Sequence, residues 1–444
     1  MSPIITALTR YGAMSSGDLF KQVSNEFSSE RSLERAISST RDLIRLGPTR
    51  HRSYALGRPE MPPSPVYMRD EGGRDHFLGE VQALRADQWT WGAVAAPQPW
   101  MSLGHIGPYM DVYQGLPWFM DVFRPAGFLG RAWVRQHAAA HGWSLDIQSW
   151  TDDQTLTAAR QVPWDWRGSL SLGPFVDMDH QLIATGDRLV EYAKRANLVS
   201  DGGIVGASVD GEQPKFTAVV LEGETQRPVL VKFSERMTGN PAARRWGDIM
   251  LTEAVAQQVI ALHGLESAAT EVWIYDDRMW LETTRFDRIG ARGRRGMVSL
   301  HALAQSFRYQ GPQNGWGQAA EHLQLRGALS EEHVAQIKHI ATIGHLLLNT
   351  DMHMGNLSFL VSNSLPALRV APIYDMTPMR WVPASVQQRV PALAPEPLYK
   401  TDDREAMVIA AEIWEETARR ELVTEEWRKW SSQRAKQIRE ALGE

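Results

Sequence analysis

Residues 340–360 of the chain read IATIGHLLLNTDMHMGNLSFL, in which an apolar helix leads through a short polar loop into an apolar strand. Asp351 and Asn356 lie on this loop, and Asp375 ends the apolar stretch VAPIYD nineteen residues after Asn356. Phosphoryl transfer needs a carboxylate that orients or deprotonates the attacking hydroxyl, together with amide and carboxylate oxygens that hold Mg²⁺ on the phosphates. The order and spacing therefore indicate a site for ATP and Mg²⁺ centred on Asp351, Asn356 and Asp375.

A second part of such a site is expected upstream, where a strand contains a lysine. Residues 216–221 and 229–233 read as two strands joined by a turn, and Lys232 lies inside the second strand. The helix that follows carries Glu253 near its expected start. A strand lysine can bind the α- and β-phosphates, and a glutamate on the next helix can orient that lysine.

The arrangement predicts an α+β, protein-kinase-like fold with two lobes. Two further strands are expected at 270–276 and 279–285, and the remainder, about 299–350 and 385–442, has mainly helical patterns. A β-rich small lobe would thus precede a helical large lobe. We expect four units, which are residues 1–58, 67–200, 201–288 and 289–444, with the proline-rich segment 58–66 as a semi-rigid linker.

Residues 1–58 are expected to form a winged helix-turn-helix. Serine-containing N-cap clusters at 15–18 and 28–29 open the second and third helices, and the third helix is expected to run as far as Leu46. The segment through Arg58 has nine Lys/Arg and five Asp/Glu, although the whole chain has a formal charge of −5. Local positive charge favours double-stranded DNA as a partner. The alternative is a helical protein-interaction module with a solvated basic face.

The basic side chains expected to contact DNA are grouped on two elements of this unit. In the winged fold, the third helix enters the major groove and the wing touches the backbone. The predicted contacts are Arg31, Arg35, Arg41 and Arg45 on the third helix, and Arg50 and Arg52 in the wing.

Composition excludes several classes of site. The 444-residue chain has no cysteine, so disulfides, thiol catalysis and cysteine zinc sites are excluded. No signal peptide and no apolar run long enough to span a membrane are recognised, so we expect a cytoplasmic protein without a membrane partner. His137 and His141 have metal-capable spacing, but no third ligand lies beside them, which favours a solvated helix face.

Five blocks of the sequence resemble the HipA family of serine/threonine kinases, the toxins of type II toxin–antitoxin systems. The resemblance is good over about residues 200–385, looser over 67–200, and the added N-terminal unit resembles the YjjJ-like subgroup. The matching blocks are SVDGEQPK at 208–215, TE at 252–253, RFDR at 285–288, TDMHMGN at 350–356 and APIYD at 371–375.

The resemblance implies a role for each matching residue. It makes Asp351 the catalytic base, Asn356 and Asp375 the Mg²⁺ ligands, Glu253 the orienting residue and Ser208 the site of autophosphorylation. A phosphate on Ser208 would add negative charge that is expected to eject the loop from the ATP site. The implied ATP-binding residues are Asp210, Gly211, Glu212, Gln213, Lys215, Lys232, Thr284, Arg285, Phe286 and His353.

Three functions remain open at the level of the sequence. The leading one is an ATP- and Mg²⁺-dependent protein kinase toxin whose family implies a translation component as substrate and a small DNA-binding antitoxin as partner. Gly355 stands where the family often has lysine, and Asp210 and Glu212 make the phosphate loop acidic. These departures favour slow turnover, or a DNA-binding regulator whose pseudokinase part senses a nucleotide. A metal-dependent DNA-cleaving toxin is the third reading, but it leaves Lys232 and the glycine-rich turn unexplained.

Overall fold

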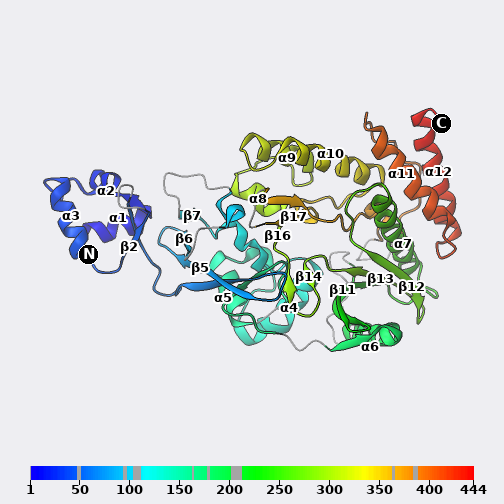
Figure 1. The fold of residues 1–444 in the computed structure, drawn as a ribbon, viewed down its shortest axis with the longest axis horizontal. Helices are drawn as coiled ribbons and strands as arrows, with labels where there is room; N and C mark the ends of the chain where they lie inside the picture. Colours follow the sequence, from blue (N-terminus) through cyan, green and yellow to red (C-terminus); the bar gives the residue numbers. More distant parts are fainter. Residues whose placement is uncertain are drawn as a thin grey trace.

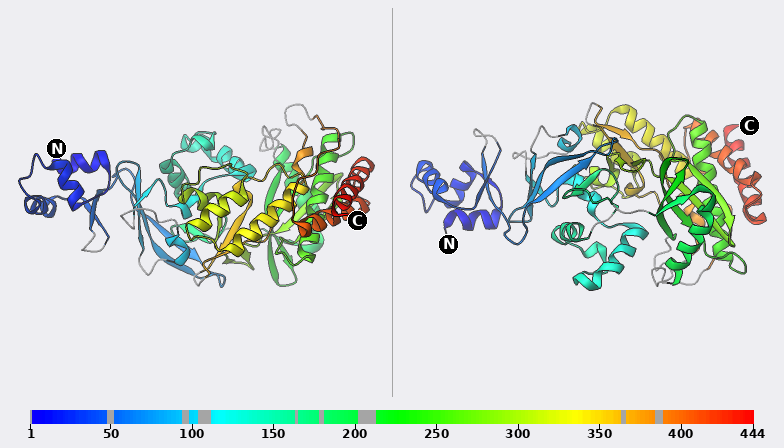
Figure 2. Two further views of the ribbon diagram at one scale, coloured as in Figure 1. Left: turned by 90° about the horizontal axis from the view of Figure 1, so that it is seen from above. Right: turned by 60° about the horizontal axis from the view of Figure 1, so that its bottom comes forward.

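The computed structural model describes residues 2–47, 52–93, 98–103, 112–162, 165–177, 181–201, 213–362, 366–383 and 389–444. The molecule is elongated, with a small N-terminal unit at one end and the last two helices at the other (Figures 1 and 2). Of the residues predicted to act in the site or on DNA, Arg50, Ser208, Asp210, Gly211 and Glu212 lie outside the described residues.

The N-terminal unit has three helices and a three-stranded antiparallel sheet. Its elements are α1 (Pro3–Tyr11), β1 (Met14–Ser15), α2 (Ser16–Val23), α3 (Glu30–Ser39), β2 (Leu43–Leu46) and β3 (Ser53–Leu56), with strand order β1-β3-β2. The predicted caps are confirmed, because Ser15 accepts a hydrogen bond from the backbone of Asp18 and Ser29 forms a capping box with Ser32.

The predicted length of the third helix is wrong. Helix α3 ends at Ser39, and residues 43–46 instead form β2, which pairs antiparallel with β3. Asp42 turns the chain with a left-handed φ of 68°, and the apolar residues after it fit a strand as well as a helix. Arg31 and Arg35 therefore lie on α3, whereas Arg41 lies in the turn and Arg45 on β2.

The middle unit is built on a five-stranded antiparallel sheet whose strands are ordered β7-β6-β5-β4-β8. Trp91, Trp100 and Trp118 pack around Phe119 in edge-to-face contacts, so they belong to the core of this unit. The elements are β4 (Ser64–Arg69), β5 (Asp75–Ala83), β6 (Gln88–Ala93), η2 (Pro99–Ser102), β7 (Val112–Gln114), η3 (Trp118–Phe123), α4 (Gly127–His141), η4 (Ile147–Ser149), α5 (Asp152–Gln161) and β8 (Leu170–Leu172).

The small lobe is a second five-stranded sheet, ordered β12-β13-β11-β10-β9, with a helix on each face. Helix α6 packs on one face through Tyr192 and Ala196, and α7 packs on the other through Met250 and Ala254. The elements are β9 (Leu182–Ala184), η5 (Thr185–Asp187), α6 (Arg188–Asp201), β10 (Lys215–Glu222), β11 (Thr225–Phe233), α7 (Pro241–Leu262), β12 (Thr270–Tyr275) and β13 (Arg278–Thr284).

Two predicted positions in this lobe need correction. The expected boundary at residue 200 is too late, because β9 pairs with β10 and α6 shares the apolar core of this sheet. Glu253 was expected near the start of its helix, but α7 begins at Pro241, with Asn240 as its N-cap, so Glu253 lies beyond the middle.

The large lobe is mainly helical, and a small antiparallel sheet, β16-β17-β18, lies against its helices. Its elements are β14 (Arg288–Ile289), β15 (Gly293–Arg294), β16 (Met297–Ser299), α8 (Leu300–Ser306), α9 (Trp316–Leu325), α10 (Glu331–Leu346), η6 (Met354–Asn356), β17 (Ser358–Val361), β18 (Leu368–Val370), η7 (Met379–Trp381), α11 (Arg404–Arg419) and α12 (Glu425–Leu442). Among the described residues, no helix is both long enough and apolar enough to cross a membrane.

Candidate functional site

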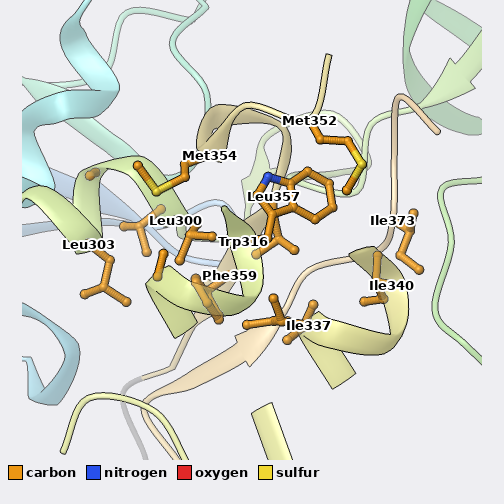
Figure 3. Packing of buried hydrophobic residues seen from close by; sticks show 14 of the residues in the cluster. Leu300, Leu303, Trp316, Ile337, Ile340, Met352, Met354, Leu357, Phe359 and Ile373 are labelled. Carbon is orange, nitrogen blue, oxygen red and sulfur yellow. The ribbon is translucent and has the colours of Figure 1, made fainter. Parts of the chain in front are cut away.

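The loop between α10 and β17 is held by apolar side chains that alternate with exposed polar ones. Met352, Met354 and Leu357 are buried in the core of the large lobe, near Leu300 and Trp316 (Figure 3). Asp351, just before Met352, and His353, between the two methionines, are exposed. Burial of the three apolar side chains thus fixes the loop and presents the polar groups beside them to the outside.

Hydrogen bonds within this loop fix the position of Asn356. Its Nδ2 donates to the backbone carbonyl of Asp351 at 2.8 Å. The Nδ1 of His353 accepts from the backbone N–H of Gly355 at 3.0 Å, and Trp316 donates to the carbonyl of His353 at 3.1 Å. Because Nδ2 donates to this carbonyl, Oδ1 is the side-chain atom of Asn356 that can bind a cation.

Lys232 joins the two lobes through two carboxylates. Its Nζ lies 2.7 Å and 2.9 Å from the carboxylate oxygens of Glu253, and it also contacts the carboxylate of Asp375. Lys232 and Glu253 are 5% and 1% exposed, so water does not screen this pair. Burial raises the pKa of Glu253 above its ordinary value, against the attraction of Lys232.

Asp375 has a strained backbone and a strongly ionised side chain. Its φ is 53°, which lies in the left-handed region that residues other than glycine rarely adopt. Burial alone would raise the pKa of its carboxyl, but Lys232 and Lys215 outweigh burial and lower it to about 2. An ionised carboxylate of this kind is a suitable ligand for Mg²⁺.

Sequence reasoning missed two residues that organise this centre. Asn349 is buried, accepts a hydrogen bond from the backbone of Asp351 and donates one to the backbone carbonyl of Asp375. The hydroxyl of Tyr374 donates to the carbonyl of Gly355 at 2.9 Å and shares a hydrogen bond with Ser358. Burial raises the pKa of Tyr374 to about 12, so this hydroxyl stays protonated. In the sequence, the only signal for these two residues is that a polar side chain shortly precedes each carboxylate, Asn349 by two positions and Tyr374 by one.

The other residues predicted to bind ATP are spread along the small lobe. Lys215 lies opposite Lys232 in the β10–β11 pair, so both lysines lie on the same face of the sheet. Gln213 is buried and contacts the sulfur of Met250. Phe286 packs near Tyr374, with 5.7 Å between the ring centroids, and the hydroxyl of Thr284 accepts from Arg227 at 3.1 Å.

Arg285 is engaged in a buried ion network that links the middle unit to the end of the small lobe. Its guanidinium contacts Asp165 and Asp287, and Asp165 also pairs with Arg288 and Arg294. Burial alone would raise the pKa of Asp165, but the three guanidinium groups hold it well below its usual range. The side chain of Arg285 is therefore committed to this network, which borders a cavity of about 310 Å³.

The oxygen atoms at the centre of the site fit Mg²⁺. The described residues contain no group of three or more His, Cys, Asp or Glu side chains placed to hold a metal ion. Mg²⁺ does not need such a group, because it keeps several waters and commonly uses one or two protein ligands together with substrate phosphates. The oxygens of Asn356 and Asp375 match this smaller requirement.

Comparisons with known proteins give one consistent family. A family model described as the HipA-like C-terminal domain matches residues 207–442, and one described as the YjjJ-like toxin middle domain matches residues 60–176. Toxin YjjJ of Escherichia coli (strain K12) is 30% identical over 429 residues, which are 93% of this chain and 92% of that protein.

Two solved structures are also similar to the chain, at low sequence identity. The Shewanella oneidensis MR-1 complex of HipA, HipB and operator DNA contains a chain with 13% identity and a TM-score of 0.49, and the match covers 84% of this chain and 95% of that one. The Helicobacter pylori proinflammatory kinase CtkA has 13% identity and a TM-score of 0.35, with coverage of 51% and 92%.

Proposed function

Because the chain belongs to the HipA-like family and has an α+β, protein-kinase-like fold, we propose that it is a serine/threonine protein kinase toxin. In this proposal it transfers the γ-phosphate of ATP to a protein in the cytoplasm and requires Mg²⁺. The contact of Lys232 with both Glu253 and Asp375 carries the proposal, because the lysine proposed to bind phosphate is then next to the carboxylate proposed to bind the metal.

Each residue at the centre has a distinct role in this reaction. Asp351, exposed on its tethered loop, accepts the proton of the attacking hydroxyl. Lys232 binds the phosphates, and Glu253 holds its ammonium in place. Asn356 and Asp375 supply the oxygens that hold Mg²⁺, which, when bound, neutralises charge on the phosphates.

Phosphate transfer is tested with purified protein, labelled ATP and MgCl₂, followed by detection of label on the protein itself and on lysate proteins. We expect label with the wild type and a loss of about 100-fold or more with Asp351→Asn. The control is Asp402→Asn, which changes an exposed aspartate away from the loop and should label like the wild type.

Two results would replace the proposal by one of its alternatives. Measurable ATP binding without any labelled product would favour a nucleotide-sensing pseudokinase. Cleavage of plasmid DNA without ATP, lost in Asp351→Asn, would favour the metal-dependent nuclease. Label on Ser208, identified by peptide mass, would support autophosphorylation at that residue.

We also propose that residues 1–58 form a winged helix-turn-helix that binds double-stranded DNA. The order of helices and strands and the antiparallel β2–β3 hairpin support this assignment. Arg31 and Arg35 are exposed on α3, while Leu33 and Ile37 on the same helix face the core. The solvent-facing side of α3 thus offers these two arginines, beside the exposed Glu30 and Glu34, while its apolar face stays packed. A small DNA-binding antitoxin is the further partner that the family resemblance implies.

A further inference from the structure

Asn349 lies between the two segments that carry the carboxylates of the proposed site. Its Oδ1 accepts a hydrogen bond from the backbone N–H of Asp351 at 3.0 Å, and its Nδ2 donates one to the backbone carbonyl of Asp375 at 3.2 Å. One side chain therefore joins the loop after α10 to a segment 26 residues further along the chain.

The surroundings fix this side chain in one orientation. Asn349 is only 5% exposed, and its own backbone N–H donates to the carbonyl of Gly344 at 2.9 Å. Leu348, just before it, has a left-handed φ of 58° and turns the chain out of α10. At this low exposure, little water reaches the amide to replace its two partners.

The chemistry of the position calls for a side-chain amide. One partner is a donor and the other an acceptor, so the residue must accept and donate at once, which an amide of this length does. Asp375 needs such support because its φ of 53° is unfavourable for a residue with a side chain, and strained residues persist only when their surroundings hold them.

We propose that Asn349 is a positioning residue that sets the placement of Asp375 relative to Asp351. It would touch neither nucleotide nor metal. Its two hydrogen bonds would hold the strained backbone of Asp375 so that this carboxylate and the oxygen of Asn356 face the same cation. This inference rests on the proposed kinase function and adds to it a residue on which metal affinity depends.

The test measures binding of a fluorescent ATP analogue as MgCl₂ is added, so the readout does not require phosphate transfer. For Asn349→Ala, the Mg²⁺ concentration at half-saturation should rise about tenfold or more, the usual effect of losing a residue that supports a metal ligand. Affinity for the analogue without Mg²⁺ should change less than about twofold, and kcat should fall more than KM rises.

Two further variants keep the test decisive. Asn349→Leu has a similar volume and removes both hydrogen bonds without adding a charge, so it should weaken Mg²⁺ binding in the same direction and serves if Asn349→Ala does not fold. Asn240→Ala removes another asparagine that accepts a backbone hydrogen bond, at the remote start of α7, and should bind Mg²⁺ like the wild type.

The two possible failures are distinguishable. A folded Asn349 variant with the Mg²⁺ dependence of the wild type would overturn the positioning role and leave the kinase proposal intact. A wild type that binds the analogue with no dependence on Mg²⁺ would overturn the proposed function, and this inference with it.

Discussion

Lys232 and Glu253 form a buried ion pair in which the lysine Nζ lies within hydrogen-bond distance of both carboxylate oxygens, at 2.7 Å and 2.9 Å. The lysine comes from a strand of the small lobe and the glutamate from the helix that packs on that strand's sheet. Because the same ammonium also contacts Asp375, one cation balances two carboxylates from different lobes. Loss of its charge should therefore affect stability as well as activity.

Lys232→Met should destabilise the protein by about 3–5 kcal/mol, because it leaves the buried carboxylate of Glu253 and the partly exposed carboxylate of Asp375 without a cation. The change is measured as the shift in free energy of unfolding in urea. Lys338→Met removes an exposed lysine paired with Glu321 and should change stability by less than about 1 kcal/mol. Equal effects of the two variants would contradict the importance of the buried pair.

Asp165→Asn should loosen the junction between the middle unit and the small lobe. The carboxylate lies 2.7 Å from Arg288 and 3.1 Å from Arg294, and it also contacts Arg285. Its removal leaves three largely buried guanidinium groups with one fewer counter-charge, at a cost of about 3–5 kcal/mol. The midpoint of urea unfolding and protease cleavage between residues 160 and 300 measure the effect.

The control for this junction is Glu440→Gln. Glu440 pairs with Lys436 at 3.7 Å on the exposed surface of α12, where ion pairs contribute little. We expect no measurable change in the unfolding midpoint. A comparable loss in both variants would show that the network around Asp165 has no special role.

Asp248 should make stability depend on pH. It accepts hydrogen bonds from the backbone N–H and hydroxyl of Thr424 at 2.8 Å and 2.7 Å, and burial raises its pKa to about 6 from an ordinary value of 3.8. A raised carboxyl pKa means that the folded state binds more protons between these values, so stability falls as the pH rises through this window. The difference between the two pKa values limits this loss of folding stability to about 3 kcal/mol.

Asp248→Asn isolates this contribution, because the amide keeps the shape and does not titrate. The difference in free energy of unfolding between variant and wild type should be small at about pH 4 and should favour the variant increasingly up to about pH 7. Urea unfolding at several pH values measures it. A difference that is constant over this range would show that Asp248 does not titrate as described.

Replacement of both Arg31 and Arg35 by alanine should weaken duplex DNA binding and reduce its salt dependence. Each lost phosphate contact reduces the magnitude of the slope of log affinity against log salt concentration by about one. The slope of the double variant should therefore be smaller in magnitude by about two. Fluorescence anisotropy with labelled duplex DNA over a range of salt concentrations measures the slope. Arg10→Ala, which removes an exposed arginine of α1, is the control and should keep the wild-type slope.

The sequence by itself determined the features that depend on neighbours along the chain. The serine caps at Ser15 and Ser29 arise from contacts within a few residues, and the strand that contains Lys232 is marked by a local apolar pattern. Periodicity and capping are short-range properties, so they can be read without the fold. The candidate residues for chemistry were found in the same way, from the order of their side-chain types.

Only the tertiary structure decided which distant groups meet. Asn349 could be identified as a link between Asp351 and Asp375 only once the two segments were placed side by side. Arg285 is predicted to bind ATP within the segment 284–286, and only the structure shows that its side chain pairs with Asp165, 120 residues earlier. Residues 43–46 became a strand because β3 offered a partner. Such pairings depend on the energy of contacts between remote segments, which no local pattern encodes.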